Sequence, residues 1–185
     1  KGIRVEEGYH PLISEPVKNS ISTSKGVLLT GSNASGKSTF LKMMAINALL
    51  AQTIYTVTAK QYNGTFSCLF TSMSLKDDLE NKESYYIVEI KSIKRILDYY
   101  KSKKISVLCF VDEVLRGTNT VERIAASTQI LKGMSGEGIQ CFAATHDIEL
   151  THLLENIYDN YHFEEEIKDG DVLFNYQLRS GRATT

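Results

Sequence analysis

The stretch Gly31-Ser32-Asn33-Ala34-Ser35-Gly36-Lys37-Ser38-Thr39 decides the fold, because it matches the phosphate-binding pattern Gly-x-x-x-x-Gly-Lys-Ser/Thr. The apolar run 26–30 before it predicts a buried strand, and the residues from Lys37 onward predict a helix of about four turns. Glycine lets the backbone bend tightly, so that several N–H groups point at one anion beside the helix N-terminus. Strand, glycine loop and helix in this order predict a cradle for nucleotide phosphates.

The residues of this cradle have separate expected roles. Lys37 is expected to reach the β- and γ-phosphates of ATP, and the Ser38 hydroxyl is expected to bind Mg²⁺. The remaining cradle residues are expected to bind the nucleotide as well, and they are Gly31, Ser32, Asn33, Ala34, Ser35, Gly36 and Thr39.

Length, composition and charge narrow the class of protein. The 185 residues, with 42% hydrophobic and 23% charged side chains, predict a single globular domain over 1–185, cut from a longer chain. A net charge of −1 gives no basic field for nucleic acid, so any DNA contacts are expected in segments outside this chain. No apolar run is long enough to cross a bilayer, and the three cysteines favour buried core positions in a reducing cytoplasm.

The rest of the chain alternates between strand and helix patterns. Apolar runs at 65–70, 105–111 and 139–144 predict strands, and short strands are expected within 3–17. Helices are expected at about 120–132 and along the apolar stripe Tyr86, Ile90, Ile93, Leu97 and Tyr100. Two alternating segments between 158 and 178 predict a hairpin with its turn at 168–171.

Two further strand ends carry groups suited to phosphate chemistry. The strand that ends at Asp112-Glu113 places two carboxylates at the edge where parallel sheets bind ligands. Asp112 is expected to hold Mg²⁺ through its water shell, and Glu113 to orient or deprotonate the water that attacks the γ-phosphate. His146 follows the strand 139–144 in the same way and is expected to hydrogen-bond the γ-phosphate.

These three segments together resemble the ABC class of P-loop ATPases, and within it the ATPase domain of the MutS DNA mismatch-repair family. Residues 31–39 resemble its Walker A motif, 112–119 its Walker B and D-loop, and 144–146 its Ala-Thr-His switch. The resemblance implies an α/β P-loop NTPase fold of the ABC ATPase type. Its sheet would be mainly parallel and flanked by helices, with an antiparallel β portion near the N-terminus and a C-terminal β-hairpin.

The resemblance also implies further site residues and a mechanism. Val17 and Asn19 fall where the family binds nucleotide, while Ser84 and Asn119 would act in trans on the site of a second copy. ATP would then join a homodimer, and its hydrolysis would release the subunits to drive a DNA clamp in mismatch repair or related DNA maintenance. The isolated domain is expected to hydrolyse ATP slowly, because it would be mostly monomeric. Leu115, Asn119 and Tyr85 depart from the family pattern and indicate a divergent branch.

Three alternatives remain open on the sequence. A transporter's nucleotide-binding subunit would carry Leu-Ser-Gly-Gly-Gln before the acidic strand end, and this chain has no such sequence. A small-molecule kinase would need an arginine-rich lid, but only Arg116 and Arg123 lie between the acidic strand end and the hairpin. A scaffold that binds nucleotide without hydrolysing it would have no use for Glu113 and His146.

Overall fold

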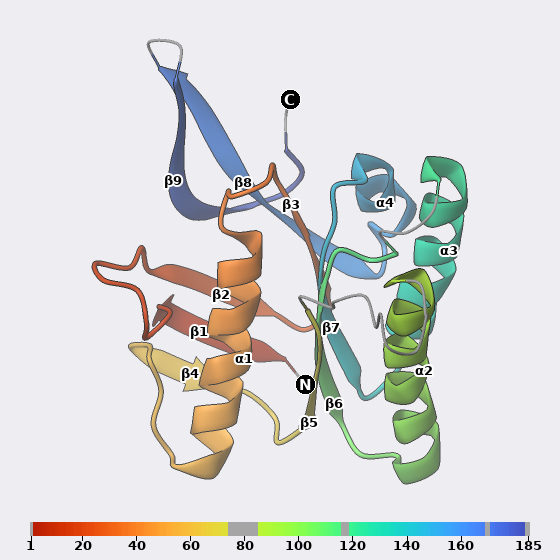
Figure 1. Ribbon diagram of the computed structural model, residues 1–185. Coiled ribbons are helices and arrows are strands. Elements are labelled where there is room, and N and C mark those ends of the chain that lie inside the picture. Colours follow the sequence, from red (N-terminus) through yellow and green to blue (C-terminus); the bar gives the residue numbers. More distant parts are fainter. Residues whose placement is uncertain (1, 74–84, 116–118, 169–170, 184–185) are drawn as a thin grey trace.

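A computed structural model describes residues 2–73, 85–115, 119–168 and 171–183 (Figure 1). Within this part of the chain, nine strands form two sheets. Strands β5-β6-β7-β3-β8-β9 form a six-stranded sheet, and β2-β1-β4 form a three-stranded sheet. The strand bounds are β1 Ile3–Gly8, β2 Asn19–Thr23, β3 Gly26–Thr30, β4 Gln61–Asn63, β5 Cys68–Ser72, β6 Val107–Asp112, β7 Ile139–Ala144, β8 Tyr158–Lys168 and β9 Asp171–Ser180. The described helices are α1 Lys37–Thr53, α2 Tyr85–Lys103, α3 Thr120–Gly133 and α4 Ile148–Leu153.

The large sheet is covered on both faces, and this explains the continuous apolar runs of its central strands. In Figure 1, α1 and the small sheet lie on one side of it, and α2, α3 and α4 lie on the other. Alternate side chains of β6 point to opposite faces of the sheet. Leu108 and Phe110 pack with α1, whereas Cys109 and Val111 pack with α2 and α3. Two separate hydrophobic cores therefore fix the central strands from opposite faces.

Several elements lie where the sequence predicts them. Strands β3 and β7 have the predicted bounds, α1 is 17 residues long, and β8 and β9 pair as the predicted hairpin. Residues 169–170 of its predicted turn lie outside the described residues. The predicted strand 65–70 is shifted to β5, and the predicted helical stripe lies in α2, where Ile93 is buried. Strands β2 and β4 and helix α4 were not predicted.

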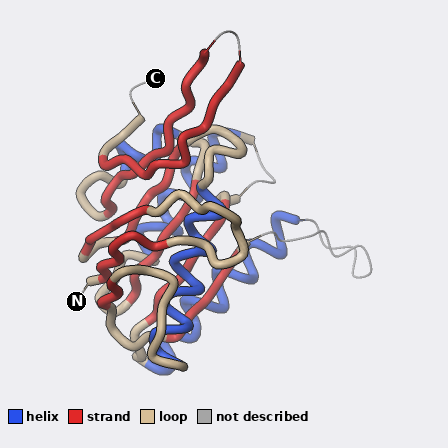
Figure 2. The backbone as a smooth tube through the Cα atoms, turned by 90° about the vertical axis from the view of Figure 1, so that its left-hand side faces the viewer, coloured by secondary structure: helices blue, strands red, loops and turns tan. Residues whose placement is uncertain are grey.

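The fold class predicted from the sequence needs correction. The sequence predicted a P-loop NTPase of the ABC ATPase type, with a mainly parallel sheet, an antiparallel β portion near the N-terminus and a C-terminal hairpin. The architecture is instead a mixed α/β one that does not belong to the ABC ATPase type. Three of the seven described strand pairings are antiparallel: β1 with β2, β1 with β4, and β8 with β9. The reason is connectivity, because β9 pairs with β8, the strand that directly precedes it in the chain, while β1 pairs with neighbours outside the large sheet. Figure 2 shows the β8–β9 hairpin rising past the rest of the chain.

Candidate functional site

The loop between β3 and α1 turns through three residues with left-handed backbone angles. The φ angles of Gly31, Ala34 and Gly36 are 142°, 66° and 113°. A Cβ atom at Gly31 would lie 2.8 Å from Oγ of Ser35 and 2.9 Å from the carbonyl oxygen of Phe163. This position therefore requires glycine, because the loop and the backbone of β8 approach each other closely there.

Helix α1 begins at this loop without a side-chain cap. Gly36 occupies the capping position, and the first turn of the helix has no acidic residue. The N–H groups at a helix N-terminus carry partial positive charge and are left without helical partners. This end of α1 therefore offers the loop a set of anion-binding donors.

Lys37 is the first residue of α1, and its side chain lies across the loop. The residue is 5% exposed, and Nζ donates hydrogen bonds to the carbonyl oxygens of Gly31 and Ser32 at 2.6 and 2.8 Å. The hydroxyl groups of Ser32 and Ser35 are buried without a hydrogen-bond partner among the described residues. Because buried hydroxyl groups ordinarily have partners, the loop holds two donors that a bound oxyanion would satisfy.

Three strand ends meet at one edge of the large sheet beside this loop. Ala144 at the end of β7 pairs with Asp112 of β6 on one side and with Leu29 of β3 on the other. Beyond the strands, the Glu113 amide donates to the carbonyl of Ala144 at 3.1 Å, and the Thr145 amide donates to that of Leu29 at 2.9 Å. The structure therefore brings the loop, the acidic pair and the segment of His146 to a common edge, as parallel pairing requires.

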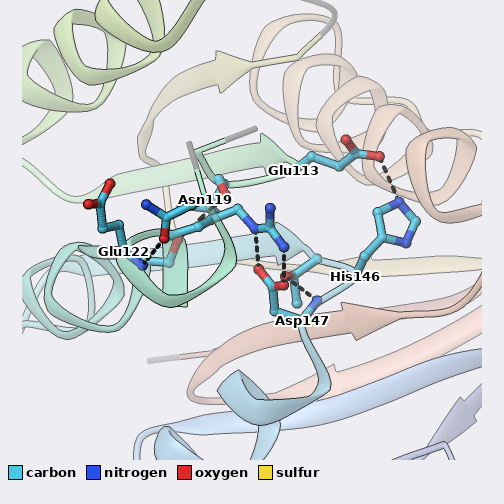
Figure 3. Close-up of polar contacts among 9 residues, drawn as sticks. Glu113, Asn119, Glu122, His146 and Asp147 are labelled. Carbon is cyan, nitrogen blue, oxygen red and sulfur yellow. Dashed lines mark hydrogen bonds and ion pairs between the residues drawn. The ribbon is translucent and has the colours of Figure 1, made fainter. Parts of the chain in front are cut away.

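Glu113 and His146 contact each other directly at this edge. Nε2 of His146 lies 2.8 Å from Oε1 of Glu113. Figure 3 shows the two side chains pointing toward each other. The Glu113 side chain is 12% exposed, whereas that of His146 is 39% exposed. Glu113 lines the cavity beside the glycine loop, and His146 lines an adjoining one with Gly31 and Ser32. A carboxylate and an imidazole at hydrogen-bond distance can hold or move one proton.

Two side chains, Glu89 and Asn119, fix backbone positions after Glu113. Glu89 of α2 is 2% exposed, and its Oε1 accepts a hydrogen bond of 2.9 Å from the amide of Leu115. Asn119 caps α3, because its Oδ1 accepts a hydrogen bond of 3.0 Å from the amide of Glu122 (Figure 3). Helix α2 therefore restrains the chain soon after Glu113, and Asn119 fixes the start of α3.

A second charged pair joins α3 to the residue after His146. Nε and Nη2 of Arg123 donate hydrogen bonds to the two carboxylate oxygens of Asp147, at 2.8 and 2.6 Å. The hydrogen bonds that Arg123 donates to Asp147 raise the pKa of Arg123, so the guanidinium stays charged. The Asp147 side chain is 7% exposed, and this two-point contact fixes its orientation.

The wall of the cavity beside the loop combines Val17 and Asn19, which the resemblance implied, with two hairpin residues that the sequence did not predict. The cavity holds about 610 Å³ and is lined by Val17 and Asn19 and by Phe163 and Tyr176 of the hairpin, in addition to the loop. Asn19 joins β2 to β9, because Nδ2 donates to the carbonyl of Tyr176 at 2.9 Å and Oδ1 accepts from the amide of Leu178 at 2.8 Å. The backbone of Tyr176 is in the left-handed region, with a φ of 56°. No local sequence pattern predicts that this tyrosine lies at the cavity.

The other expected site residues differ in where they lie. Ser38 and Thr39 line the cavity, and Asp112 is half-buried at the sheet edge. Ser84 falls outside the described residues, and Asn119 is exposed at the start of α3.

In the part of the chain that the structure describes, no cluster of three or more histidine, cysteine or acidic residues is arranged to hold a metal ion. No helix in the described part is long and apolar enough to cross a bilayer.

Comparison with protein families completes the correction of the fold class. The family model described as MutS domain V matches residues 27–185, which include the loop, the acidic strand end, His146 and the hairpin. This assignment replaces the ABC ATPase type as the description of the fold.

Individual relatives agree with the family match. The chain is 34% identical over 194 residues to the DNA mismatch repair protein MutS of Bacillus licheniformis, covering 98% of this chain and 22% of that protein. It is 32% identical to mouse MutS protein homolog 4 (97% and 20%) and 33% identical to the Aquifex pyrophilus DNA mismatch repair protein MutS (97% and 22%). The chain spans about a fifth of the length of these relatives. It belongs to the MutS family.

Proposed function

We propose that this chain binds ATP with Mg²⁺ and hydrolyses it to ADP and phosphate, within a MutS-like protein of DNA mismatch repair or related DNA maintenance. The observation that carries the proposal is the meeting of Lys37, the Asp112-Glu113 pair and His146 at one sheet edge, set by the pairing of β3, β7 and β6. The repair role draws on the names of its relatives.

The loop supports phosphate binding by its backbone and its hydroxyl groups. The uncapped start of α1 and the buried hydroxyls of Ser32 and Ser35 fit an oxyanion that would satisfy them. Lys37 would exchange its contacts with the loop carbonyls for contacts with phosphate oxygens. The adjoining cavity, with Val17, Asn19 and Tyr176 in its wall, offers room for the rest of the nucleotide.

The residues present also fit a magnesium ion. Ser38 and Asp112 offer the hydroxyl and carboxylate oxygens that Mg²⁺ prefers, and Mg²⁺ keeps several waters of its own. When bound, it would neutralise charge on the β- and γ-phosphates. The same two residues are the ones that the sequence motifs single out.

Glu113 is proposed as the base in hydrolysis. Its carboxylate takes a proton from water while the water oxygen forms a bond to the γ-phosphorus and the bond between that phosphorus and the ADP oxygen breaks. His146, 2.8 Å from Glu113, orients the carboxylate and can donate a hydrogen bond to a γ-phosphate oxygen. The proposal is supported by the positions of the two side chains, because each lines a cavity that also includes residues of the loop.

We further propose that the nucleotide site is shared in a homodimer. Asn119 is exposed at the start of α3, where a second copy can be contacted, and Ser84 is proposed to act in trans with it. DNA would be bound mainly by segments outside this chain, because its net charge is −1. The three cysteines are free, which suits a cytoplasmic protein.

Calorimetric titration with ATP and Mg²⁺ tests the proposal, together with turnover measured over a range of protein concentrations. We expect heat on ATP addition and slow turnover that rises with protein concentration, because two copies complete each site. Absence of heat would contradict nucleotide binding. Rapid turnover that does not depend on protein concentration would contradict the shared site.

A further inference from the structure

The turn that carries His146 is held at both of its ends by different parts of the fold. On one side, the buried Thr145 donates its amide to Leu29 of β3 at 2.9 Å, and its Oγ1 accepts from the amide of Asp147 at 3.0 Å. On the other side, both carboxylate oxygens of Asp147 are held by Arg123 of α3 (Figure 3). His146 lies between a sheet anchor and a helix anchor, so a shift of α3 against the sheet must change its position.

We propose that Arg123 and Asp147 are positioning residues that make the His146–Glu113 contact depend on the placement of the first turn of α3. The inference rests on the proposed hydrolytic function and concerns how that site is regulated. Neither residue is assigned a contact with nucleotide, and their effect passes through His146. A contact that displaces the start of α3 would therefore change the position of His146 and, with it, the rate of ATP hydrolysis.

A continuous series of bonds connects the surface to Glu113. The amide of Arg123 donates to the carbonyl of Asn119 at 2.9 Å, and the Arg123 guanidinium holds Asp147, which is covalently joined to His146. His146 then contacts Glu113 at 2.8 Å. Coupling between sites is carried by such contiguous contacts when they join elements that can move relative to each other.

The surface end of this series is suited to receive a partner. Residues 119–122 are exposed, and Val121 is 78% exposed although it is apolar. The partner we assign to it is the second copy of the proposed homodimer. Contact there would act on the same helical turn that carries Arg123.

The Arg123–Asp147 pair is better suited to transmit position than an ordinary surface ion pair. Its side chains are 24% and 7% exposed, compared with 64% and 31% for the Lys60–Glu6 pair. The two parallel hydrogen bonds fix both distance and orientation, whereas a single exposed contact is easily exchanged for water.

The test uses Arg123→Leu, which removes the pair, and Asp147→Asn, which keeps the size of the side chain and removes its charge. Both are made in the full-length protein, with Arg182→Leu as the matched control because it removes an arginine–carboxylate pair with Glu155. The measurements are ATP affinity by calorimetry, turnover at saturating ATP, and the NMR signal of His146 in protein labelled at histidine Cε1. His146→Gln assigns that signal among the histidine signals of the protein.

We expect turnover at saturating ATP to fall about tenfold in both variants while ATP affinity changes less than about twofold, because geometry at the reacting centre is lost and binding is kept. The His146 signal should shift in both variants, and the double variant should be no slower than either single one, because the two residues act as one unit. Arg182→Leu should behave as the unchanged protein.

An unchanged His146 signal in Arg123→Leu and Asp147→Asn would overturn the proposal, as would turnover equal to that of the unchanged protein. Additive losses in the double variant would also overturn it. If the unchanged protein does not hydrolyse ATP, the proposed function fails, and the His146 signal still decides whether α3 positions this histidine.

Discussion

The glycine loop and the Glu113–His146 region lie at the same sheet edge, but they are built in different ways. The loop is made mostly by backbone, through positive φ angles and a helix start, and two of its hydroxyls have no partner among the described residues. In the second region, side chains contact other groups from separate elements: His146 with Glu113, Asp147 with Arg123, and Glu89 with Leu115. A backbone-built part is ready for a ligand as it stands, whereas a side-chain-built part depends on helices held in place around it.

The largest effect is expected from Glu113→Gln, which separates binding from chemistry. Glutamine keeps the shape of the side chain but cannot accept the proton, so turnover should fall by about 10³-fold. ATP affinity should stay within about threefold, because the loop is intact. Single-turnover kinetics and calorimetry measure the two quantities, with Glu137→Gln in an exposed turn as the control. If Glu113→Gln keeps the turnover of the unchanged protein, Glu113 is not the base in hydrolysis.

Lys37→Met should produce the opposite pattern, with its main loss in binding. Loss of charge-assisted hydrogen bonds to phosphate is expected to weaken ATP binding about 100-fold. Calorimetry measures the change. Lys42→Met is the matched control, because Lys42 is an exposed lysine of the same helix. Equal loss in both variants would mean that general positive charge, and not the cradle, attracts the nucleotide.

Asn19→Ala tests whether the cavity wall belongs with the loop. The change removes both hydrogen bonds to β9 and should lower the free energy of unfolding by about 2 kcal/mol, at about 1 kcal/mol for each bond. ATP affinity should fall about fivefold because Tyr176 is no longer held beside the loop. Urea unfolding and calorimetry measure these effects, and Asn156→Ala at an exposed asparagine is the control. Unchanged ATP affinity in Asn19→Ala would mean that the hairpin does not contribute to nucleotide binding.

The smallest effect is expected at Glu164, where the two regions border a common cavity. Hydrogen bonding from His162 and the nearby Arg179 lower the pKa of Glu164, so its ionised form stabilises the folded state. This stabilisation is present above the ordinary glutamate pKa and is lost as the pH falls through the lowered pKa. The difference in unfolding free energy between the unchanged protein and Glu164→Gln should therefore shrink on acidification. Urea unfolding between neutral pH and pH about 3 measures this difference, and a constant difference would contradict the assignment.

The sequence predicted those parts of the fold that have a local pattern. The continuous apolar runs of β3 and β7 and the pairing of β8 with β9 were found because hydrophobic periodicity and turn residues specify them. Strand β4 has three residues and helix α4 has six, so neither is long enough to show a period. Such elements are determined by the partners they pack against in the folded chain. The small sheet has the same limit, because β1 pairs with β4 across a long stretch of sequence and no local pattern specifies that pairing.

The candidate site divides in the same way. Lys37, Asp112, Glu113 and His146 were singled out because each follows a recognisable strand, and the structure brings their segments together at one edge. Tyr176 and the Arg123–Asp147 pair were missed because their partners lie far away in the sequence. Arg123 and Asp147 are 24 residues apart, and Asn19 and Tyr176 are 157 apart. Only the folded sheet makes them neighbours.

The hydrogen bonds of Asn19 to β9 have a consequence for how the protein is made. One wall of the cavity comes from the start of the chain and the other from its last strand, and they meet across 157 and 159 residues. During synthesis, a ribosome-bound chain can complete the glycine loop early, but it cannot close the cavity until Leu178 has emerged. The closed cavity would then be absent from any chain that is truncated before Leu178.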